Sequence, residues 1–201
     1  MSHFSVTVFC GSSMGRAAEF HDAALAFGAG LAARRMNLVF GGGSVGLMGV
    51  IAGSTIAAGG TVTGVIPEFL RGREAEFHGL TELIITDSMH TRKRRMFVRG
   101  DVFVVLPGGL GTLDELIEIL TWKQLGLHAK PILICDVLGW ATPLISLLDH
   151  LINQGFVNET AHALIETLDG VAPTLARLEA IASQSSVSLE QPRSDSVSGI
   201  L

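Results

Sequence analysis

A glycine-rich segment followed by two carboxylates occupies residues 105–116, VLPGGLGTLDEL. In this segment a short apolar run is followed by Gly108, Gly109, Gly111 and Thr112. Glycine lets a ligand approach the backbone closely, and the unpaired amide groups at a helix start favour an anion. A plain tight turn is the simpler interpretation, but GGxGT at a strand-to-helix junction favours a phosphate site. We therefore predict that this segment binds a phosphate group.

Two other glycine-rich segments follow predicted strands, GSSMG at 11–15 and VFGGGSVGLMG at 39–49. The second contains the GxGxxG pattern of dinucleotide-binding proteins. That fingerprint normally follows the first strand and needs an acidic residue after the next strand. Here it follows the second strand, and the acidic candidate, Glu68, comes directly after a proline. The three loops are therefore more typical of a mononucleotide site at one edge of a parallel sheet.

Glu115 is the candidate carboxylate of this site. It lies three residues after Thr112, and T-x-x-E is also the pattern of a capping box, in which both side chains only close the helix start. The spacing does not decide between the two interpretations. A carboxylate in the first turn after a phosphate loop can reach the sugar of a nucleotide, which favours the functional one.

The densest basic stretch is SMHTRKRRM at 88–96. Helical spacing places four of its residues on one face, namely Met89, Arg92, Lys93 and Met96. Two cations on an otherwise apolar face need an anionic partner, either a carboxylate of the fold or a ligand phosphate. Their alternative role is to extend past the apolar face into solvent.

Short apolar runs alternate with helical patterns along the chain. The predicted strands are 5–10, 37–40, 61–66, 82–86, 101–106, 131–135 and 163–167. The predicted helices are 16–35, 45–59, 88–99, 112–124, 140–154 and 172–183. This alternation predicts an α/β fold, a Rossmann-like doubly wound parallel sheet in a three-layer α/β/α domain. The domain is predicted to span residues 1–183, and the serine-rich tail at 184–201 is predicted to be disordered.

Composition limits the class of protein. The net charge of −5 argues against a nucleic-acid-binding surface, and the strand-like N-terminus does not resemble a signal peptide, so a cytoplasmic protein is expected. Although 48% of the 201 residues are hydrophobic, no apolar run reaches the ~18 residues of a spanning helix, so no membrane partner is expected. The apolar content indicates some burial in an oligomer. Cys10 and Cys135 are predicted to be buried, reduced thiols.

Six segments occur together in this order: GSS (11–13), GGGSVGLMG (41–49), VIPEFLRGRE (65–74), DSMHTRKRRM (87–96), PGGLGTLDE (107–115) and LTWKQLGLHAKP (120–131). Over about residues 5–155 they resemble the LONELY GUY family of cytokinin riboside 5′-monophosphate phosphoribohydrolases. The resemblance implies a Rossmann-type homodimer with active sites near the subunit interface and no cofactor or metal. It also implies hydrolysis of the N-glycosidic bond of a purine nucleoside 5′-monophosphate, such as a cytokinin nucleotide or AMP, to the free base and ribose 5-phosphate.

The resemblance places the family's catalytic arginine on Arg92 and its catalytic glutamate on Glu115. Its ligand contacts fall on Glu74, Lys93, Gly109, Leu110, Gly111, Thr112, Leu113, Asp114 and Thr121. The loops and the helix face complete the candidate binding set with Gly11, Ser12, Gly42, Gly43 and Met89.

Three alternative functions fit parts of the sequence. A lysine decarboxylase, the label that such proteins often carry, would need pyridoxal phosphate on a lysine, and Lys93, Lys123 and Lys130 lie in no recognisable cofactor setting. A non-catalytic nucleotide binder would use the same loops and leave Glu115 without a task. Nucleic-acid binding through the RKRR run is disfavoured, because helical phase puts Arg94 and Arg95 on a solvated face and the chain is acidic.

Overall fold

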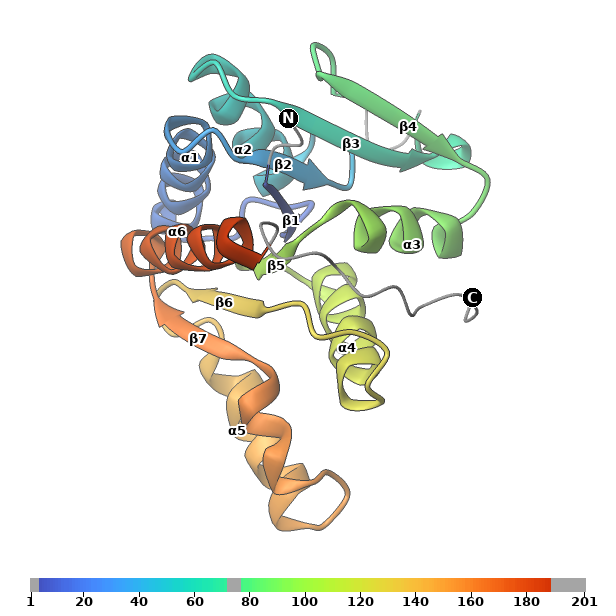
Figure 1. The fold of residues 1–201 in the computed structure, drawn as a ribbon. Coiled ribbons are helices and arrows are strands. Elements are labelled where there is room, and N and C mark those ends of the chain that lie inside the picture. Colours follow the sequence, from blue (N-terminus) through green and yellow to red (C-terminus); the bar gives the residue numbers. More distant parts are fainter. Residues whose placement is uncertain (1–3, 72–76, 189–201) are drawn as a thin grey trace.

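The computed structural model describes residues 4–71 and 77–188, and over this range the chain forms a parallel sheet between two layers of helices (Figure 1). The seven strands are ordered β4-β3-β2-β1-β5-β6-β7, and neighbours pair in parallel. Their bounds are β1 (Ser5–Phe9), β2 (Asn37–Phe40), β3 (Val62–Pro67), β4 (Glu82–Thr86), β5 (Val102–Val105), β6 (Ile132–Asp136) and β7 (Glu166–Asp169).

Helices cover both faces of the sheet. The first layer consists of α1 (Ala18–Ala33), α2 (Gly46–Ala57) and α6 (Val171–Ser188). The second consists of α3 (Met89–Arg99), α4 (Leu110–Gln124) and α5 (Thr142–Asn153). Short 3-10 helices, η1 (Glu68–Leu70) and η2 (Glu159–Leu164), precede β4 and β7. The predicted Rossmann-like three-layer fold is confirmed.

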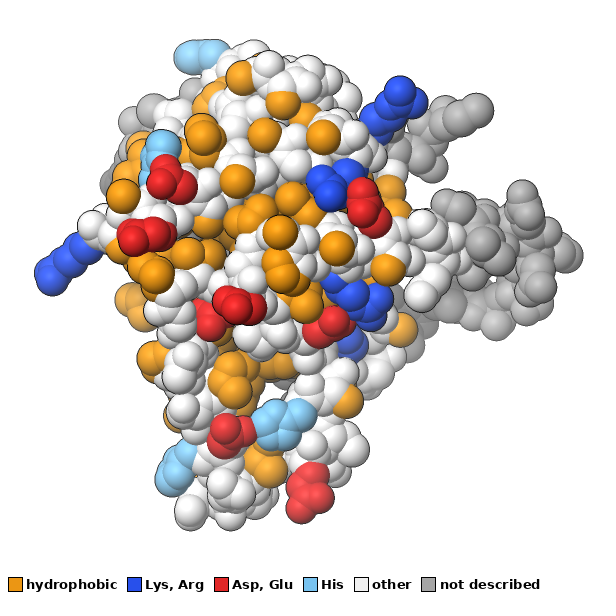
Figure 2. Space-filling view, turned by 90° about the vertical axis from the view of Figure 1, so that its left-hand side faces the viewer, with side chains coloured by type: hydrophobic (Ala, Val, Ile, Leu, Met, Phe, Trp, Pro, Cys, Tyr) orange, Lys and Arg blue, Asp and Glu red, His pale blue; other side chains and the backbone are white. Residues whose placement is uncertain are grey.

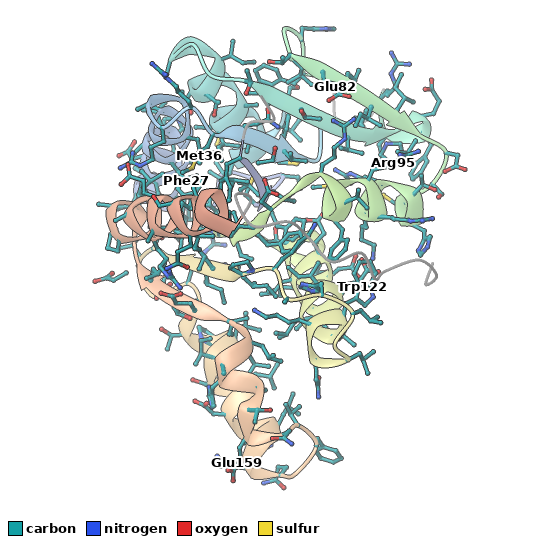
Figure 3. The ribbon with its side chains drawn as sticks, viewed as in Figure 1. Phe27, Met36, Glu82, Arg95, Trp122 and Glu159 are labelled. Atoms are coloured by element: carbon teal, nitrogen blue, oxygen red, sulfur yellow. The ribbon has the colours of Figure 1, made fainter. Side chains whose placement is uncertain are left out.

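The central strands are apolar because both of their faces are buried. In β5, Val104 packs into the core below α1, α2 and α6, whereas Phe103 and Val105 pack into the core below α3, α4 and α5. In the first of these cores, Phe27 of α1 and Met36 point toward the sheet (Figure 3). Strands buried on both faces lack a polar alternation, which is why they are recognisable as continuous apolar runs.

The surface on the side of α1 and α6 mixes residue types. In Figure 2, hydrophobic side chains gather in the middle of this face, and acidic and basic side chains are interspersed around them. No helix in the described ranges is long and apolar enough to cross a membrane.

The sheet has one topological switch point. β1 and β5 are neighbours, but the chain leaves β1 toward α1 on one face and leaves β5 toward α4 on the other. Diverging connections open a crevice at the carboxyl ends of such strands, where α/β proteins bind ligands. Two of the three predicted glycine loops, those after β1 and β5, lie at this point.

Most element boundaries differ from the sequence prediction by one or two residues, and three of the differences need comment. α4 begins at Leu110 and not at residue 112, because Gly111 and Thr112 are already helical. β7 begins at Glu166, since much of the apolar run at 163–167 belongs to η2. α6 continues to Ser188, so part of the predicted disordered tail is helix, and residues 189–201 lie outside the described residues.

Candidate active site

The loops after β1 and β5 are joined at the switch point. The Gly11 amide donates a hydrogen bond to the Pro107 carbonyl oxygen at 3.0 Å. A Cβ atom on Gly108 would overlap the Thr112 hydroxyl oxygen and would lie 2.8 Å from the Gly11 nitrogen. Gly108 is therefore required for the close approach of these two loops.

The start of α4 supplies unpaired amides to the crevice. Gly109 is the N-cap, and the first helical hydrogen bond runs from the Leu113 amide to the Gly109 carbonyl oxygen at 3.1 Å. The amides of Leu110, Gly111 and Thr112 precede that bond and have no acceptor within the helix, so they favour an anion. The capping-box alternative for T-x-x-E is wrong, because Thr112 lies inside the helix and not at its N-cap.

A polar cavity of about 130 Å³ opens beside this helix start. Arg92 from α3 and Glu115 from α4 line the same cavity, although 22 residues separate them in the chain. The predicted residues that line it are Ser12, Met89, Arg92, Gly109, Leu110, Gly111, Thr112, Asp114 and Glu115. The structure therefore brings the two candidate catalytic residues and the predicted phosphate loop together.

Arg92 is held rigidly in the wall of the cavity. Only 5% of the residue is exposed, and its Nε and Nη2 atoms donate to the Val65 and Gly41 carbonyl oxygens at 3.1 and 2.8 Å. α3 begins just before it, with the Ser88 hydroxyl accepting from the Thr91 amide at 3.2 Å. A guanidinium group fixed by backbone carbonyls is preorganised for electrostatic work.

Lys93 has a different environment from its neighbour Arg92. Its ammonium group lies 3.2 Å from an Asp114 carboxylate oxygen and 3.1 Å from a Glu118 carboxylate oxygen. Of the two partners predicted for this cation, the fold supplies the carboxylate. Arg94 and Arg95, on the other side of α3, are exposed as predicted (Arg95 is labelled in Figure 3).

The second glycine loop supports the site and does not line it. Gly41 leaves room for the Arg92 guanidinium, and a Cβ atom on Gly46 would overlap the backbone of Ser12 and Ser13. The GxGxxG glycines therefore allow the β2–α2 loop to pack against Arg92 and against the β1 loop. Only Met48, two residues further on, reaches the cavity.

Several predicted binding residues lie away from the polar cavity. Gly42, Gly43, Lys93, Leu113 and Thr121 are not among its lining residues. The Thr121 hydroxyl donates back along α4 to the Ile117 carbonyl oxygen at 2.7 Å. Glu74 lies outside the described residues.

A larger cavity of about 270 Å³ adjoins the polar one, sharing Ser12 and Gly109 with it. Its walls are the β1 loop, the β5 loop and the side chains of Phe20, Leu47 and Trp140. Trp140 donates from its indole nitrogen to the Gly108 carbonyl oxygen at 3.2 Å. The sequence prediction missed this wall, because Trp140 belongs to a distant connection with no motif around it.

Cys10 was also missed as a residue of the polar cavity. Burial, and to a lesser extent the charge of Glu115, raises the pKa of the Cys10 thiol far above its ordinary range. The thiol therefore stays protonated and is not a nucleophile. The described residues contain no group of histidine, cysteine or acidic side chains that could hold a metal ion.

A Rossmann-like sheet with a helix start that favours an anion, an arginine and a carboxylate at its switch point is typical of nucleotide-binding proteins. The family model described as "Possible lysine decarboxylase" matches residues 48–178. The chain is 42% identical over 174 residues to the cytokinin riboside 5′-monophosphate phosphoribohydrolase LOG2 of Arabidopsis thaliana, covering 87% of this chain and 82% of the relative. It is 41% identical over 175 residues to the cytokinin riboside 5′-monophosphate phosphoribohydrolase of Rhodococcoides fascians, covering 87% and 88%. The chain belongs to the LONELY GUY family, as its motifs indicated.

Solved structures confirm the fold. The molybdenum cofactor carrier protein from Chlamydomonas reinhardtii matches with a TM-score of 0.69 at 21% identity, covering 90% of this chain and 99% of that protein. At this identity the likeness concerns the architecture alone.

Proposed function

We propose that this chain hydrolyses the N-glycosidic bond of purine nucleoside 5′-monophosphates, releasing the free base and ribose 5-phosphate. Cytokinin riboside 5′-monophosphates and AMP are the candidate substrates. The names of its relatives support the reaction class, that of hydrolases acting on N-glycosyl bonds. The observation that carries the proposal is the meeting of Arg92, Glu115 and the unpaired amides of α4 in one cavity.

The mechanism follows from the charge that develops during cleavage. Breaking a ribosyl bond builds positive charge on C1′ and O4′, as in other glycoside hydrolysis. A carboxylate beside the ribose stabilises that charge, holds the sugar hydroxyls or activates the attacking water. Glu115 is the carboxylate in the first turns of α4 that lines the cavity, and we assign these tasks to it.

Arg92 acts as a fixed positive charge in this mechanism. A guanidinium group stays protonated at any working pH, so Arg92 is not the acid that protonates the departing purine. Its rigid placement suits binding of the phosphate or of the electron-rich leaving base. The 5′-phosphate, bound by the loop amides around Gly109, Gly111 and Thr112, would supply remote binding energy that positions the sugar.

The contacts of the lysines argue against a Schiff-base decarboxylase. Lys93 is paired with two carboxylates, Lys123 donates to the Leu164 carbonyl oxygen at 2.8 Å, and Lys130 donates to the Phe97 and Gly100 carbonyl oxygens at 2.7 Å each. None of the three is among the residues that line the two cavities. Each ammonium group therefore already has a structural partner within the fold.

We further propose that the chain works as a cytoplasmic homodimer whose interface lies beside the cavity. Leu110, at the mouth of the cavity, is 87% exposed in the single chain, and Met89 and Ile117 nearby are exposed as well. Large apolar side chains grouped around a polar site are typical of a surface that another protein covers. A second copy of this chain is the proposed occupant.

The proposed function is tested with AMP and isopentenyladenosine monophosphate, followed by chromatography for the free base. We expect base release by the native chain and a loss of at least about 100-fold in Glu115→Gln. Because Gly109 caps α4, that substitution removes no helix cap, and circular dichroism shows whether the variant stays folded. Tight nucleotide binding without base release would instead support a non-catalytic nucleotide binder.

A further inference from the structure

We propose that Lys93 is a positioning residue: it ties α3 to α4 through Asp114 and Glu118, so that Arg92 and Glu115 face the same cavity. The inference rests on the proposed function and adds to it a role for Lys93 in aligning the two candidate catalytic side chains. It concerns a lysine for which the family resemblance implies only a ligand contact.

The tie is short and largely sheltered from solvent. The Lys93 ammonium lies 3.1 Å from Glu118 and 3.2 Å from Asp114, and the Lys93 and Glu118 side chains are only 17% and 22% exposed. Ion pairs that are partly withdrawn from water are less screened than surface pairs, so this one can hold a defined geometry. Asp114 is the more exposed partner, and Glu118 is therefore the main anchor.

The position of the tie in the sequence links it to catalysis. Lys93 directly follows Arg92 on α3, and Asp114 directly precedes Glu115 on α4. A bond between Lys93 and these carboxylates therefore fixes the distance between the two helices at the level of the catalytic pair. One turn further along, Phe97 of α3 meets Trp122 of α4 edge to face, with ring centroids 5.0 Å apart (Trp122 is labelled in Figure 3). The aromatic contact holds the far end of the helix pair, and the ion pair holds the end at the cavity.

The electrostatics agree with this role. Burial alone would lower the pKa of Lys93, but the carboxylates of Glu118 and Asp114 more than offset it, and the pKa is raised. The ammonium charge is thus already balanced by the fold before any phosphate arrives. Anchoring of the phosphate then falls to the α4 amides.

The two possible roles of Lys93, a phosphate contact and a positioning residue, predict different kinetic effects of the same substitutions. A phosphate contact predicts that Lys93→Met raises KM for AMP with little change in kcat, and that Glu118→Gln is harmless. A positioning role predicts that both substitutions lower kcat by a similar factor, about tenfold, because the catalytic pair loses its alignment. It also predicts that the charge-exchanged chain Lys93→Glu with Glu118→Lys recovers much of the lost kcat.

The experiment measures kcat and KM for AMP in the native chain, the two single variants and the charge exchange, with Arg99→Gln as the control. Arg99 lies on the same helix and forms an exposed ion pair with Glu82 at 2.7 Å, away from the cavity, so its loss should leave kcat unchanged. Circular dichroism shows whether each variant folds. A selective rise of KM in Lys93→Met, or a charge exchange no better than the single variants, would overturn the proposal.

Failure of the proposed function is distinguishable from failure of the tie. If the native chain binds AMP but releases no base, the hydrolase proposal fails, and the tie is judged from binding alone. Calorimetric Kd values for AMP in the same four chains then replace kcat. Similar weakening in both single variants with recovery in the charge exchange supports the tie, and weakening in Lys93→Met alone contradicts it.

Discussion

Arg92 depends on the absence of a side chain at Gly41. The guanidinium occupies the space that a Cβ atom on Gly41 would fill, and it donates to the carbonyl oxygen of that same glycine. Gly41 therefore has a structural role, that of making room for Arg92, which the GxGxxG pattern does not indicate. The structure adds a contact that the sequence did not predict, between Gly41 and Arg92.

Gly41→Ala should therefore displace Arg92 and lower kcat/KM for AMP by about tenfold or more, because small misplacements at a reacting centre are costly. Steady-state kinetics measure the loss. Gly53→Ala in α2 is the matched control, since its new methyl group would lie 3.7 Å from Phe77, an ordinary contact. That variant should keep its activity and gain about 0.5–1 kcal/mol of stability from the lower chain entropy of alanine. Equal loss of activity in both variants would refute this role of Gly41.

His128 is held in one neutral form by its two contacts. Its Nε2 atom bonds to the Ile119 carbonyl oxygen at 2.8 Å, and its Nδ1 atom accepts from the Lys130 amide at 3.1 Å. Burial is the main reason that the pKa of His128 lies below its ordinary value of 6.5. Protonation of Nδ1 would turn an acceptor into a donor facing another donor.

The unfolded chain therefore binds more protons than the folded chain at pH values between the folded pKa of His128 and 6.5. The free energy of unfolding should rise with pH through this window, and the contribution of His128 should be lost as the pH falls below 6.5. Thermal unfolding between about pH 5 and pH 7.5 measures the slope. We expect a smaller slope in His128→Gln than in the native chain. A native slope in His128→Gln would contradict the assignment.

At the scale of the elements, the crevice depends on the contact between the loops after β1 and β5. Gly108 and Gly109 are neighbours in sequence and differ in their surroundings: a Cβ atom on Gly108 would overlap Thr112, whereas one on Gly109 would meet nothing within 4 Å. The same residue type therefore serves two purposes. Gly108 allows two backbones to meet, and Gly109 caps a helix.

Gly108→Ala should destabilise the fold by about 1–3 kcal/mol, the usual cost of forcing extra atoms into a packed region. Gly109→Ala should cost less, about 0.5 kcal/mol, because its methyl group would meet nothing within 4 Å and only the poorer N-cap preference of alanine remains. Thermal unfolding of the two variants side by side measures the difference. Equal unfolding temperatures would show that the loops do not need their close contact.

The elements were predictable where the sequence pattern is local. Strands such as β2 and β4 have the predicted bounds, because their apolar runs end where glycine or polar residues begin. The start of α4 was placed two residues late, since Gly111 is a poor helix former that tolerates the first turn of a helix. A local sequence pattern does not show where the surrounding fold tolerates a glycine inside a helix.

At the scale of the whole molecule, the order of the strands and the placement of the helices bring the residues of the site together. Parallel pairing of β1 with β5 brings the loops after them together, and the layer of α3 and α4 then brings Arg92 to Glu115. Residue type and motif were enough to select these residues from the sequence. They could not show that Lys93 pairs with Glu118 or that Trp140 walls a second cavity, because those contacts join segments without a shared pattern.

The proposed homodimer is testable at this scale. We expect light scattering to give twice the mass of the 201-residue chain. Leu110→Asp, which places a charge on the most exposed apolar side chain beside the cavity, should shift the population toward the monomer. A native chain that stays monomeric at high concentration would remove the dimer and leave Leu110 as a rim residue of the cavity.

The most direct test of the account compares AMP with adenosine as substrates for the native chain. If the amides of α4 anchor the phosphate and thereby place the glycosidic bond at Glu115, removing the phosphate should lower kcat by at least about 100-fold as well as weaken binding. Chromatography of the released adenine at saturating concentrations of each compound gives both rates. Equal turnover of adenosine and AMP would contradict the central claim.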